Sequence, residues 1–519
     1  MKKLNFTHAG YVALSCAATL PMVVGCNAES STKRPNVIVI LADDMGVGDM
    51  SVYGATAIST PNLDRLANGG VRFNQGYASS ATSTPSRYAL MTGEYPWKNP
   101  DAKILPGDAP LLIDVEQYTL PKMMRSAGYR TAAIGKWHLG MGSGNVNWNE
   151  QISPSANDIG FDYTSLIAAT NDRVPTVFVE DGCVVGLEAD DPIYVNYKEN
   201  FEGEPTAISN PEMLKMEWDH GHNQSIMNGI PRIGYQTGGE AAHWVDEDMA
   251  DYFVDKVKAY ISECGDEPFF LYYGLHQPHV PRAPHSRFVG STELGPRGDA
   301  VVEADWCVGE LVAHLESEGL LENTIIIYSS DNGPVLNDGY KDMAAENGSK
   351  HDQLGGLRGG KYSLFEGGTR VPFLVSWRGV IEPMVSEAMV CQIDIMPSIA
   401  SLIGVEIPQM DGEDILPALM GQSTQARTSL VHEAGGKLSY RSGKWALVPP
   451  YKGLALNQKG IETGNNPKIT LWDLEADPMQ QNNLAEQYPE VVEQLWGEFT
   501  QITEGYYNPK TEDFVFGKK

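Results

Sequence analysis

A series of short apolar runs, each ending in polar or charged residues, constrains the fold of this chain more than any other feature. These runs are NVIVILADDMG at 36–46, YRTAAIGKWHLG at 129–140, PFFLYYGLHQPH at 268–279, NTIIIYSSDNG at 323–333 and VPFLVSWRG at 371–379. They are typical of parallel strands buried on both faces by helices, and helical periods intervene at 246–264 and 300–322. The pattern predicts an α/β fold with a mostly parallel sheet, in which ligands bind beyond the carboxyl ends of the strands.

The length of the chain allows more than one domain. A single core stops growing near about 250–300 residues, and this chain has 519. The later part of the sequence reads as strands of an antiparallel sheet and then a helix, at 429–434, 437–452, 468–478 and 489–502. We therefore predict a large domain over 35–423 and a smaller C-terminal α+β subdomain over 424–519.

The N-terminal segment has the pattern of a secretory signal. A short positive stretch, MKKLNF, precedes an apolar stretch that is too short to span a membrane. VVGC at 23–26 is similar to a bacterial lipobox, so we predict a signal peptide over 1–25, lipidation of Cys26 and a polar tether over 26–34. The alternative is a cleaved signal followed by an incidental cysteine. The prediction implies export and a lipid anchor in the outer membrane, facing the periplasm or the cell surface.

The net charge excludes one class of partner. The whole chain carries −29. Removal of residues 1–25 takes away Lys2 and Lys3 and no acid, which leaves −31. Nucleic-acid binding depends on clustered Lys and Arg, so we expect no nucleic-acid partner. An anionic small substrate would need a local convergence of basic residues, because more distant charges are screened beyond about 8 Å at physiological salt.

Acidic residues stand at the ends of two predicted strands. Asp43 and Asp44 close the first strand, and Asp331 and Asn332 close a later one. Neighbouring strand residues point to opposite faces, so we expect the glycines in MGVG and NGP to let the chain leave the strand. Three carboxylates and an amide form an oxygen site suited to Ca²⁺ or Mg²⁺ rather than zinc. Alone, SDNG would more often be a turn.

A run of hydroxyl residues, SSATSTPSRYALMTG at 79–93, precedes a predicted helix. Ser and Thr commonly cap helices. The second interpretation is that one hydroxyl is a nucleophile, or its precursor, in the positive field of the helix start. Arg87 would then lie one turn inside that helix.

Basic residues stand at the other strand ends, namely Lys136, His138, His279 and Lys361. Each of them alone is more often structural or solvated. Together with Arg87 they supply the converging positive charge that an acidic chain needs for an anionic substrate. The two histidines would transfer protons, because an unperturbed histidine titrates near neutral pH.

These motifs together resemble the formylglycine-dependent type I sulfatases. The segment STPSR at 83–87, followed by LMTG, is similar to the signature of that family in its serine form. The match continues in the family's order through ILADDMG, PNLDRLA, GKWHLG, HQPHVP, YSSDNGP, KYSLFEGGTRVP and LWDLEADPMQQNNLAEQYPEVVEQL. The resemblance covers nearly the whole mature chain and implies an alkaline-phosphatase-like mixed sheet flanked by helices.

The resemblance implies two cofactors. Ser83 would be oxidised to Cα-formylglycine (3-oxoalanine), whose hydrated form is the nucleophile, and a serine at this position points to an anaerobic radical-SAM maturase as a partner. Calcium would be held by Asp43, Asp44, Asp331 and Asn332, with residue 83 also at the metal.

The resemblance also implies catalytic roles. Arg87 would orient the modified residue, while Lys136, His279 and Lys361 would grip the sulfate. His279 or Lys361 would protonate the leaving sugar oxygen. His138 would take a proton from the diol as sulfate leaves. The implied reaction is hydrolysis of sulfate esters.

The only part of the sequence that bears on the substrate is the long irregular stretch at 141–240. Loops of that length are usually functional, so we expect this stretch to form the wall of the substrate site. The candidates for reading sugar hydroxyls are Asp172, Arg173, His220, His222, His276 and His351; each is equally compatible with a solvated loop residue. We expect an exo-acting carbohydrate sulfatase whose substrate is a sulfated galactose or N-acetylgalactosamine.

Two other functions remain open at this point. One is a phosphatase or phosphodiesterase of the alkaline-phosphatase superfamily that uses the unmodified serine; such enzymes typically need a second, histidine-rich metal site. The other is a glycan-binding lipoprotein without catalysis, against which the intact basic set argues.

Overall fold

The central sheet extends in both directions from β1, the first of the predicted buried strands. The structure is a computed structural model that describes residues 34–513, so the predicted signal peptide, Cys26 and nearly all of the tether lie outside the described residues. The strand order is β14, β2, β13, β12, β1, β11, β3, β4, β5, β6. In that order the bounds are Met384–Cys391, Gly70–Tyr77, Phe373–Ser376, Thr324–Ser330, Asn36–Ala42, Phe269–Gly274, Arg130–Lys136, Tyr163–Ile167, Val179–Glu180 and Cys183–Val184.

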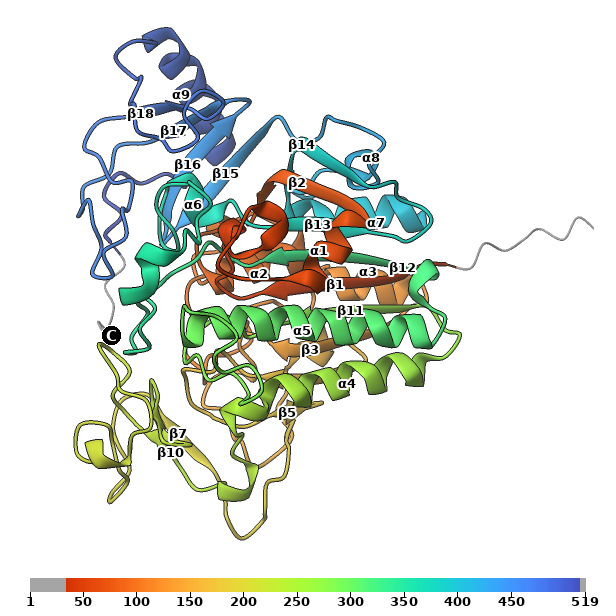
Figure 1. Cartoon of the computed structure of the whole chain (residues 1–519), viewed down its shortest axis with the longest axis vertical. Helices are drawn as coiled ribbons and strands as arrows, with labels where there is room; N and C mark the ends of the chain where they lie inside the picture. The colour runs from red at the N-terminus through yellow and green to blue at the C-terminus, as the bar shows by residue number, and fades with distance from the viewer. Residues whose placement is uncertain (1–33, 514–519) are drawn as a thin grey trace, which may run out of the picture. The chain divides into compact units, whose positions relative to one another are not determined.

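The centre of this sheet is parallel. β12, β1, β11, β3 and β4 pair in parallel, whereas β13 pairs antiparallel with both β12 and β2. The predicted α/β fold with a mixed, mostly parallel sheet is therefore confirmed. Because the central strands run in one direction, their carboxyl ends meet at one edge, on the left in Figure 1.

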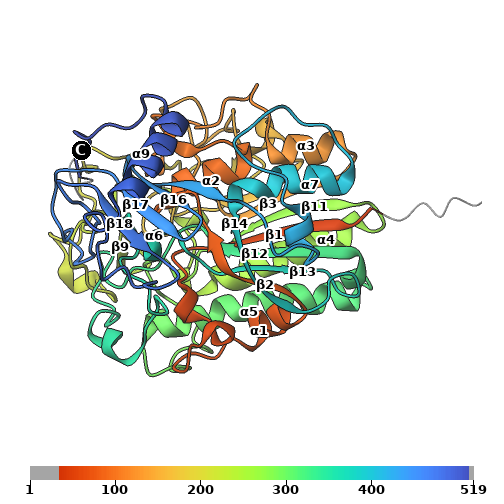
Figure 2. The same cartoon turned by 90° about the horizontal axis from the view of Figure 1, so that it is seen from above.

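Helices cover both faces, which explains why every residue of β1 is buried. Its even-numbered side chains pack with α1 (Pro61–Asn68), α4 (Met249–Cys264) and α5 (Pro296–Ser317). Its odd-numbered side chains pack with α2 (Ser83–Thr92), α3 (Leu120–Ser126) and α7 (Ile395–Ile403). Figure 2 shows α2, α3 and α7 on one side of the strands and α1 and α5 on the other.

The C-terminal residues form a second sheet, as the sequence predicts. β15 (Ser429–Ala434), β16 (Lys437–Ser442), β17 (Trp445–Val448) and β18 (Thr470–Asp473) form an antiparallel meander, followed by α9 (Pro489–Thr503). A shared hydrophobic cluster joins this subdomain to Tyr77, Ala89 and Ile393 of the large domain. The domain boundaries at 35, 423 and 424 stay a prediction.

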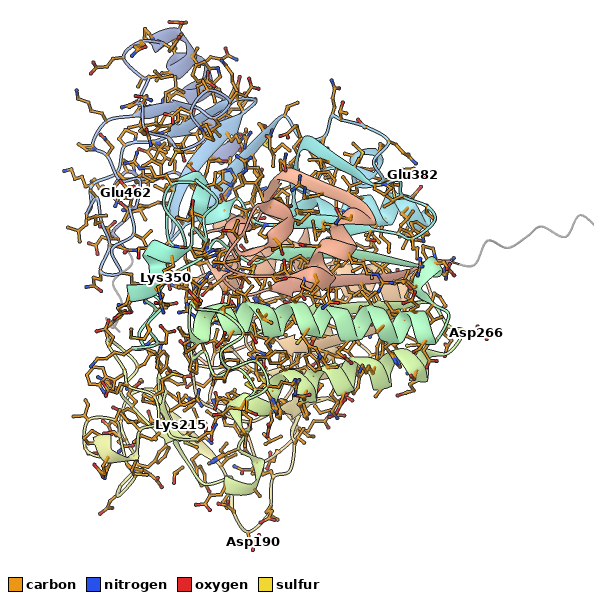
Figure 3. The ribbon with its side chains drawn as sticks, in the orientation of Figure 1. Asp190, Lys215, Asp266, Lys350, Glu382 and Glu462 are labelled. Carbon is orange, nitrogen blue, oxygen red and sulfur yellow. The ribbon has the colours of Figure 1, made fainter. Side chains whose placement is uncertain are left out.

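The irregular stretch after β4 lies on the same side as the strand carboxyl ends. Its short pairs are β7 (Tyr194–Asn196) with β10 (Tyr235–Thr237), and β8 (Ile226–Met227) with β9 (Ile230–Pro231). Figure 3 labels Lys215 of this stretch, Lys350 and Glu462 on that side, and Asp266 and Glu382 at the opposite end. In residues 34–513 no helix has the length and apolar character that a membrane crossing requires.

Helix α9 provides a test of the C-terminal packing. Phe499 is fully buried between α9 and the antiparallel sheet. Phe499→Ala should lower the free energy of unfolding by about 3–5 kcal/mol, because it removes buried apolar area and leaves a cavity. The control is Ile502→Ala on the same helix, whose side chain is 39% exposed and whose loss should cost less than about 1 kcal/mol. Urea unfolding of both variants measures the difference. Equal losses of unfolding free energy would contradict the burial of Phe499 against the antiparallel sheet.

Candidate active site

The strand-end acids converge on one point. Asp43 and Asp44 follow β1 directly and Asp331 and Asn332 follow β12, and the last register pair of these strands immediately precedes both groups. The backbone N–H of Asp44 donates to Oδ1 of Asp331 at 3.2 Å, and Nδ2 of Asn332 donates to Oδ1 of Asp44 at 2.6 Å. All four residues are buried. The adjacent, parallel pairing of β1 and β12 is therefore what builds this acidic centre.

The glycines next to these acids do not themselves turn the chain out of the strand, as the sequence analysis expected them to do. The left-handed conformation falls on Asp44 itself, with φ of 65°, which Asp tolerates better than most residues. A Cβ on Gly46 would lie 1.9 Å from the carbonyl oxygen of Gln353, and one on Gly333 would lie 1.8 Å from that of Gly367. These glycines are needed because other loops pack against them.

Ser83 lies at the centre of the acids, as the first residue of α2. Its Oγ is 3.4 Å from Oδ1 of Asp43, 3.4 Å from Oδ1 of Asn332, and accepts a hydrogen bond from Nζ of Lys136 at 3.0 Å. The N-cap residue is Thr82, whose side chain makes no capping hydrogen bond. The hydroxyl of Ser83 thus faces acids, an amide and an ammonium, and the capping interpretation of the hydroxyl run does not apply to it.

Arg87 is fully buried one turn inside α2. Its Nη2 and Nε donate to Oδ2 of Asp331 at 2.8 and 3.1 Å, and its Nη1 donates to the hydroxyl of Tyr272 at 2.6 Å. Burial opposes ionisation of Asp331, but Arg87 and Lys136 outweigh it and hold the pKa of that carboxyl well below its usual range. Arg87 therefore connects the helix of Ser83 to the acid at the end of β12.

Two buried lysines form ion pairs with the other two acids, Asp43 and Asp44. Lys136, the last residue of β3, contacts Asp43 as well as Ser83. Lys361 donates to Oδ2 of Asp44 at 2.9 Å. Burial raises the pKa of Asp43 and lowers that of Lys136, whereas neighbouring acids overcome burial at Lys361 and raise its pKa.

The two histidines are not poised near neutral pH in this structure. Burial lowers the pKa of His279 to about 3, with Lys361 adding to the effect, and burial together with Lys136 lowers the pKa of His138 well below its usual range. Both rings are consequently neutral proton acceptors here. Buried cations and the removal of water, which the sequence does not reveal, account for the difference.

The ring orientations follow from their hydrogen bonds. Nε2 of His138 lies 3.0 Å from the carbonyl oxygen of Leu105, and Nδ1 of His279 lies 2.6 Å from that of Val280. A carbonyl only accepts, so those nitrogens carry the proton. Nδ1 of His138 is buried and has no hydrogen-bond partner within residues 34–513, and Nε2 of His279 faces Oδ2 of Asp44 at 4.0 Å. Each ring therefore offers an unprotonated nitrogen to the site.

The donor set fits a hard divalent cation. The acids at the ends of β1 and β12 and the amide oxygen of Asn332 surround Ser83, and Asp43, Asp44 and His279 hold ligand atoms within 4.8 Å of one another. Carboxylate and amide oxygens are the ligands of Ca²⁺. The balancing ammonium and guanidinium groups would then face an anionic substrate group.

Three of the predicted substrate residues lie together. Asp172 accepts from Nη1 of Arg173 at 2.7 Å and lies 2.8 Å from Nε2 of His222. Burial opposes ionisation of Asp172, but Arg173 and His222 hold its pKa well below the usual range. The backbone carbonyl of His220 adjoins this cluster, at 2.9 Å from Nδ1 of His222. Its side chain points to other partners, with Nε2 at 3.1 Å from Nζ of Lys459 and Nδ1 at 3.1 Å from Asp219.

The other two predicted substrate residues lie elsewhere. His276 packs on Phe253 of α4, with ring centroids 6.5 Å apart. His351 lies 3.0 Å from Asp49, which also pairs with Arg297 at 2.7 Å. The structure does not join either histidine to the cluster around Asp172.

Some residues of the site were missed by the sequence analysis. Tyr272 holds Arg87, and Asp338 accepts from Lys361 at 3.2 Å and contacts Lys459. Asp338 lies only six residues after Asn332, so its closeness in sequence to a predicted metal ligand could have identified it. Lys459 lies in the C-terminal subdomain, in a segment without any motif.

The sequence of this chain is similar to those of known sulfatases. Residues 35–405 match the family model "Sulfatase", and residues 360–505 match "N-sulphoglucosamine sulphohydrolase, C-terminal". The chain is 46% identical to an N-acetylgalactosamine-6-O-sulfatase of Bacteroides thetaiotaomicron, covering 92% of this chain and 96% of that protein. It is 31% identical to human arylsulfatase A, covering 89% and 86%.

Solved structures agree with these relatives. A sulfatase structure from a study of glycosaminoglycan metabolism by Bacteroides thetaiotaomicron superposes with a TM-score of 0.90 at 46% identity, over 91% of this chain and 100% of that one. A phosphonate monoester hydrolase of Agrobacterium radiobacter shares the fold alone, with a TM-score of 0.56 at 17% identity, over 91% and 96%. The chain therefore belongs to the sulfatase family and hydrolyses sulfate esters of carbohydrates.

Proposed function

We propose that this enzyme removes the 6-O-sulfate of N-acetylgalactosamine, acting through calcium and a formylglycine at position 83. The position of Ser83 carries the proposal, because its Oγ meets Asp43, Asn332 and Lys136 at once. The similarity to an N-acetylgalactosamine-6-O-sulfatase over nearly the whole chain supports the sugar and the sulfate position.

The predicted cofactors fit the residues around position 83. Asp43, Asp44, Asp331 and Asn332 would hold calcium, which supplies a positive charge for the sulfate oxygens. Formylglycine supplies, once hydrated, a hydroxyl pair that acts as the nucleophile and permits release by elimination. The buried guanidinium of Arg87 orients this end of the helix, because it is fixed by both Asp331 and Tyr272.

The basic residues divide between the nucleophile and the substrate. Lys136 holds residue 83, and Nδ1 of His138 is an acceptor for the proton that must leave the nucleophile. Lys361 and His279 lie at the same oxygen of Asp44, at 2.9 and 4.0 Å. Lys361, whose pKa is raised, would grip the sulfate and supply the proton for the leaving sugar oxygen. His279, whose Nε2 carries no proton, would have to be protonated first to share that role.

The sugar would be read by the loops beyond the sheet. Asp172, Arg173 and His222 form a buried cluster of donors and acceptors, and His279 lies close enough to Asp172 to affect its pKa. Hydroxyl recognition of this type discriminates strongly, because a missing hydroxyl leaves buried polar groups unpaired. His220 would belong to the same wall of the site.

The remaining expectations concern maturation and location. An anaerobic radical-SAM maturase acting on Ser83 stays part of the proposal, as do export and the lipid anchor at Cys26 in the outer membrane. The comparisons favour sulfate over the phosphate esters of the alternative function.

The substrate is tested by sulfate release. The chain would be co-expressed with an anaerobic maturase, the mass of the Ser83 peptide checked, and sulfate release measured from the 2-, 3-, 4- and 6-sulfates of galactose, N-acetylgalactosamine and N-acetylglucosamine. We expect release from N-acetylgalactosamine 6-sulfate above all others. If fully converted protein preferred another sugar or another sulfate position, the assigned substrate would be wrong.

The modification is tested by withholding the maturase. Protein expressed without it should fold, bind calcium and release no sulfate, and Ser83→Ala should behave in the same way with the maturase present. If protein in which Ser83 is unmodified released sulfate, the formylglycine mechanism would be wrong. Faster hydrolysis of phosphate esters by that same protein would favour the phosphatase alternative.

The metal is tested by thermal unfolding. Adding Ca²⁺ at 100 times its Kd to chelator-treated protein should stabilise it by about 2.7 kcal/mol. Asp44→Asn should strongly reduce this shift because it removes a ligand charge, whereas Asp190→Asn, at an exposed residue far from the site (Figure 3), should keep it. An undiminished shift in Asp44→Asn would place the metal elsewhere.

A further inference from the structure

One residue of the C-terminal subdomain reaches the catalytic lysine through a shared acid. Lys459 contacts Oδ1 of Asp338, and Lys361 donates to Oδ2 of the same carboxylate at 3.2 Å. The side chains of Lys459, Asp338 and Lys361 are 2%, 7% and 4% exposed. Each oxygen of Asp338 is thus taken by one ammonium, in an environment that excludes most water.

The segment that carries Lys459 is fixed to the segment that carries Lys361. Residues 455–463 form a hairpin, with an antiparallel bridge between Leu456 and Glu462. Arg358 pairs with Glu462 through Nε at 2.8 Å, and Oγ of Ser363 donates to the Glu462 carbonyl at 2.6 Å. The backbone N–H of the next residue, Leu364, donates to the carbonyl of Thr463 at 2.9 Å. These contacts lie on both sides of Lys361. The hairpin that carries Lys459 is therefore bonded directly to the segment that carries Lys361.

Charge gives this contact a consequence for the reaction. A single carboxylate between two ammonium groups leaves one net positive charge, whereas Asp338 with Lys361 alone would leave none. Removal of Lys459 would also take an ammonium away from Oδ1 of Asp338 and leave the Tyr362 hydroxyl there, at 3.5 Å. Lys361 already donates to both Asp44 and Asp338. Without Lys459, the full negative charge of Asp338 would act on the Lys361 ammonium and weaken its attraction for an incoming anion.

We propose that Lys459 is a positioning residue for desulfation: it binds Asp338 and so keeps the Lys361 ammonium available to the sulfate group. The inference rests on the proposed role of Lys361 in gripping the sulfate. It assigns the C-terminal subdomain a part in the reaction, delivered through one buried carboxylate.

The test uses formylglycine-converted full-length protein and N-acetylgalactosamine 6-sulfate. Lys459→Met, which keeps the length of the side chain and removes its charge, should lower kcat/KM by about 10- to 100-fold. Lys459→Arg should recover most of the activity, because it restores a cation for Asp338. Lys452→Met, at an exposed lysine of the same subdomain, is the matched control and should leave kcat/KM unchanged. Thermal unfolding of each variant identifies any that fails to fold.

A double-mutant cycle separates positioning from a merely structural role. In an Asp338→Asn background, Lys459→Met should change kcat/KM by less than about twofold, because the carboxylate through which it acts is already gone. The same loss in both backgrounds, or no loss in Lys459→Met of the parent, would overturn the proposal.

The choice of substrate separates positioning from direct contact. The loss should be equal for the monosaccharide and for a disaccharide in which a uronic acid adjoins the sulfated sugar. A loss confined to the disaccharide would mean that Lys459 binds the neighbouring carboxylate, and the positioning role would be wrong. Absence of sulfate release by the converted parent would instead count against the proposed function, which keeps the two failures distinct.

Discussion

The balance of buried charge at the carboxyl ends of β1 and β12 is the constraint on which the rest of the structure depends. Asp43, Asp44 and Asp331 are almost completely removed from water, together with Arg87 and Lys136. Burying such ions is costly unless each one is paired and hydrogen-bonded. The site can exist only because α2, β3 and the loop of Lys361 deliver cations to the same point. The same requirement places residue 83 in the centre of the site.

This balance also gives the site the positive groups that the proposed anionic substrate requires, despite the acidity of the whole chain. The long-range field of a chain with net charge −29 opposes an anionic substrate, yet exposed charges are screened over about a Debye length. Within the site, the ammonium of Lys136 lies 3.0 Å from Oγ of Ser83. A divalent cation held by the acids would turn those groups from partners of carboxylates into partners of a sulfate.

The C-terminal subdomain reaches the candidate active site as well as packing on the large domain. It shares a hydrophobic cluster with the large domain, and its hairpin at 455–463 is bonded to the segment that carries Lys361. Two segments nearly a hundred residues apart are thereby bonded to each other. The C-terminal subdomain thus reaches Lys361 through Asp338.

The sequence by itself determined the α/β class, the principal strands and the residues that follow them, because apolar runs and the polar residues at their ends are local patterns. It also identified Ser83, Arg87 and the strand-end acids, since each stands in a motif. Only the tertiary structure decided which loop residues meet: it joined His222 to Asp172, sent His351 to Asp49, and brought Lys459 to Asp338. It also decided that the two site histidines are neutral, because the pKa of a side chain depends on burial and on neighbours that lie far away in the sequence. Contacts between distant loops leave no periodic trace in a single chain, so no pattern in this sequence could have revealed them.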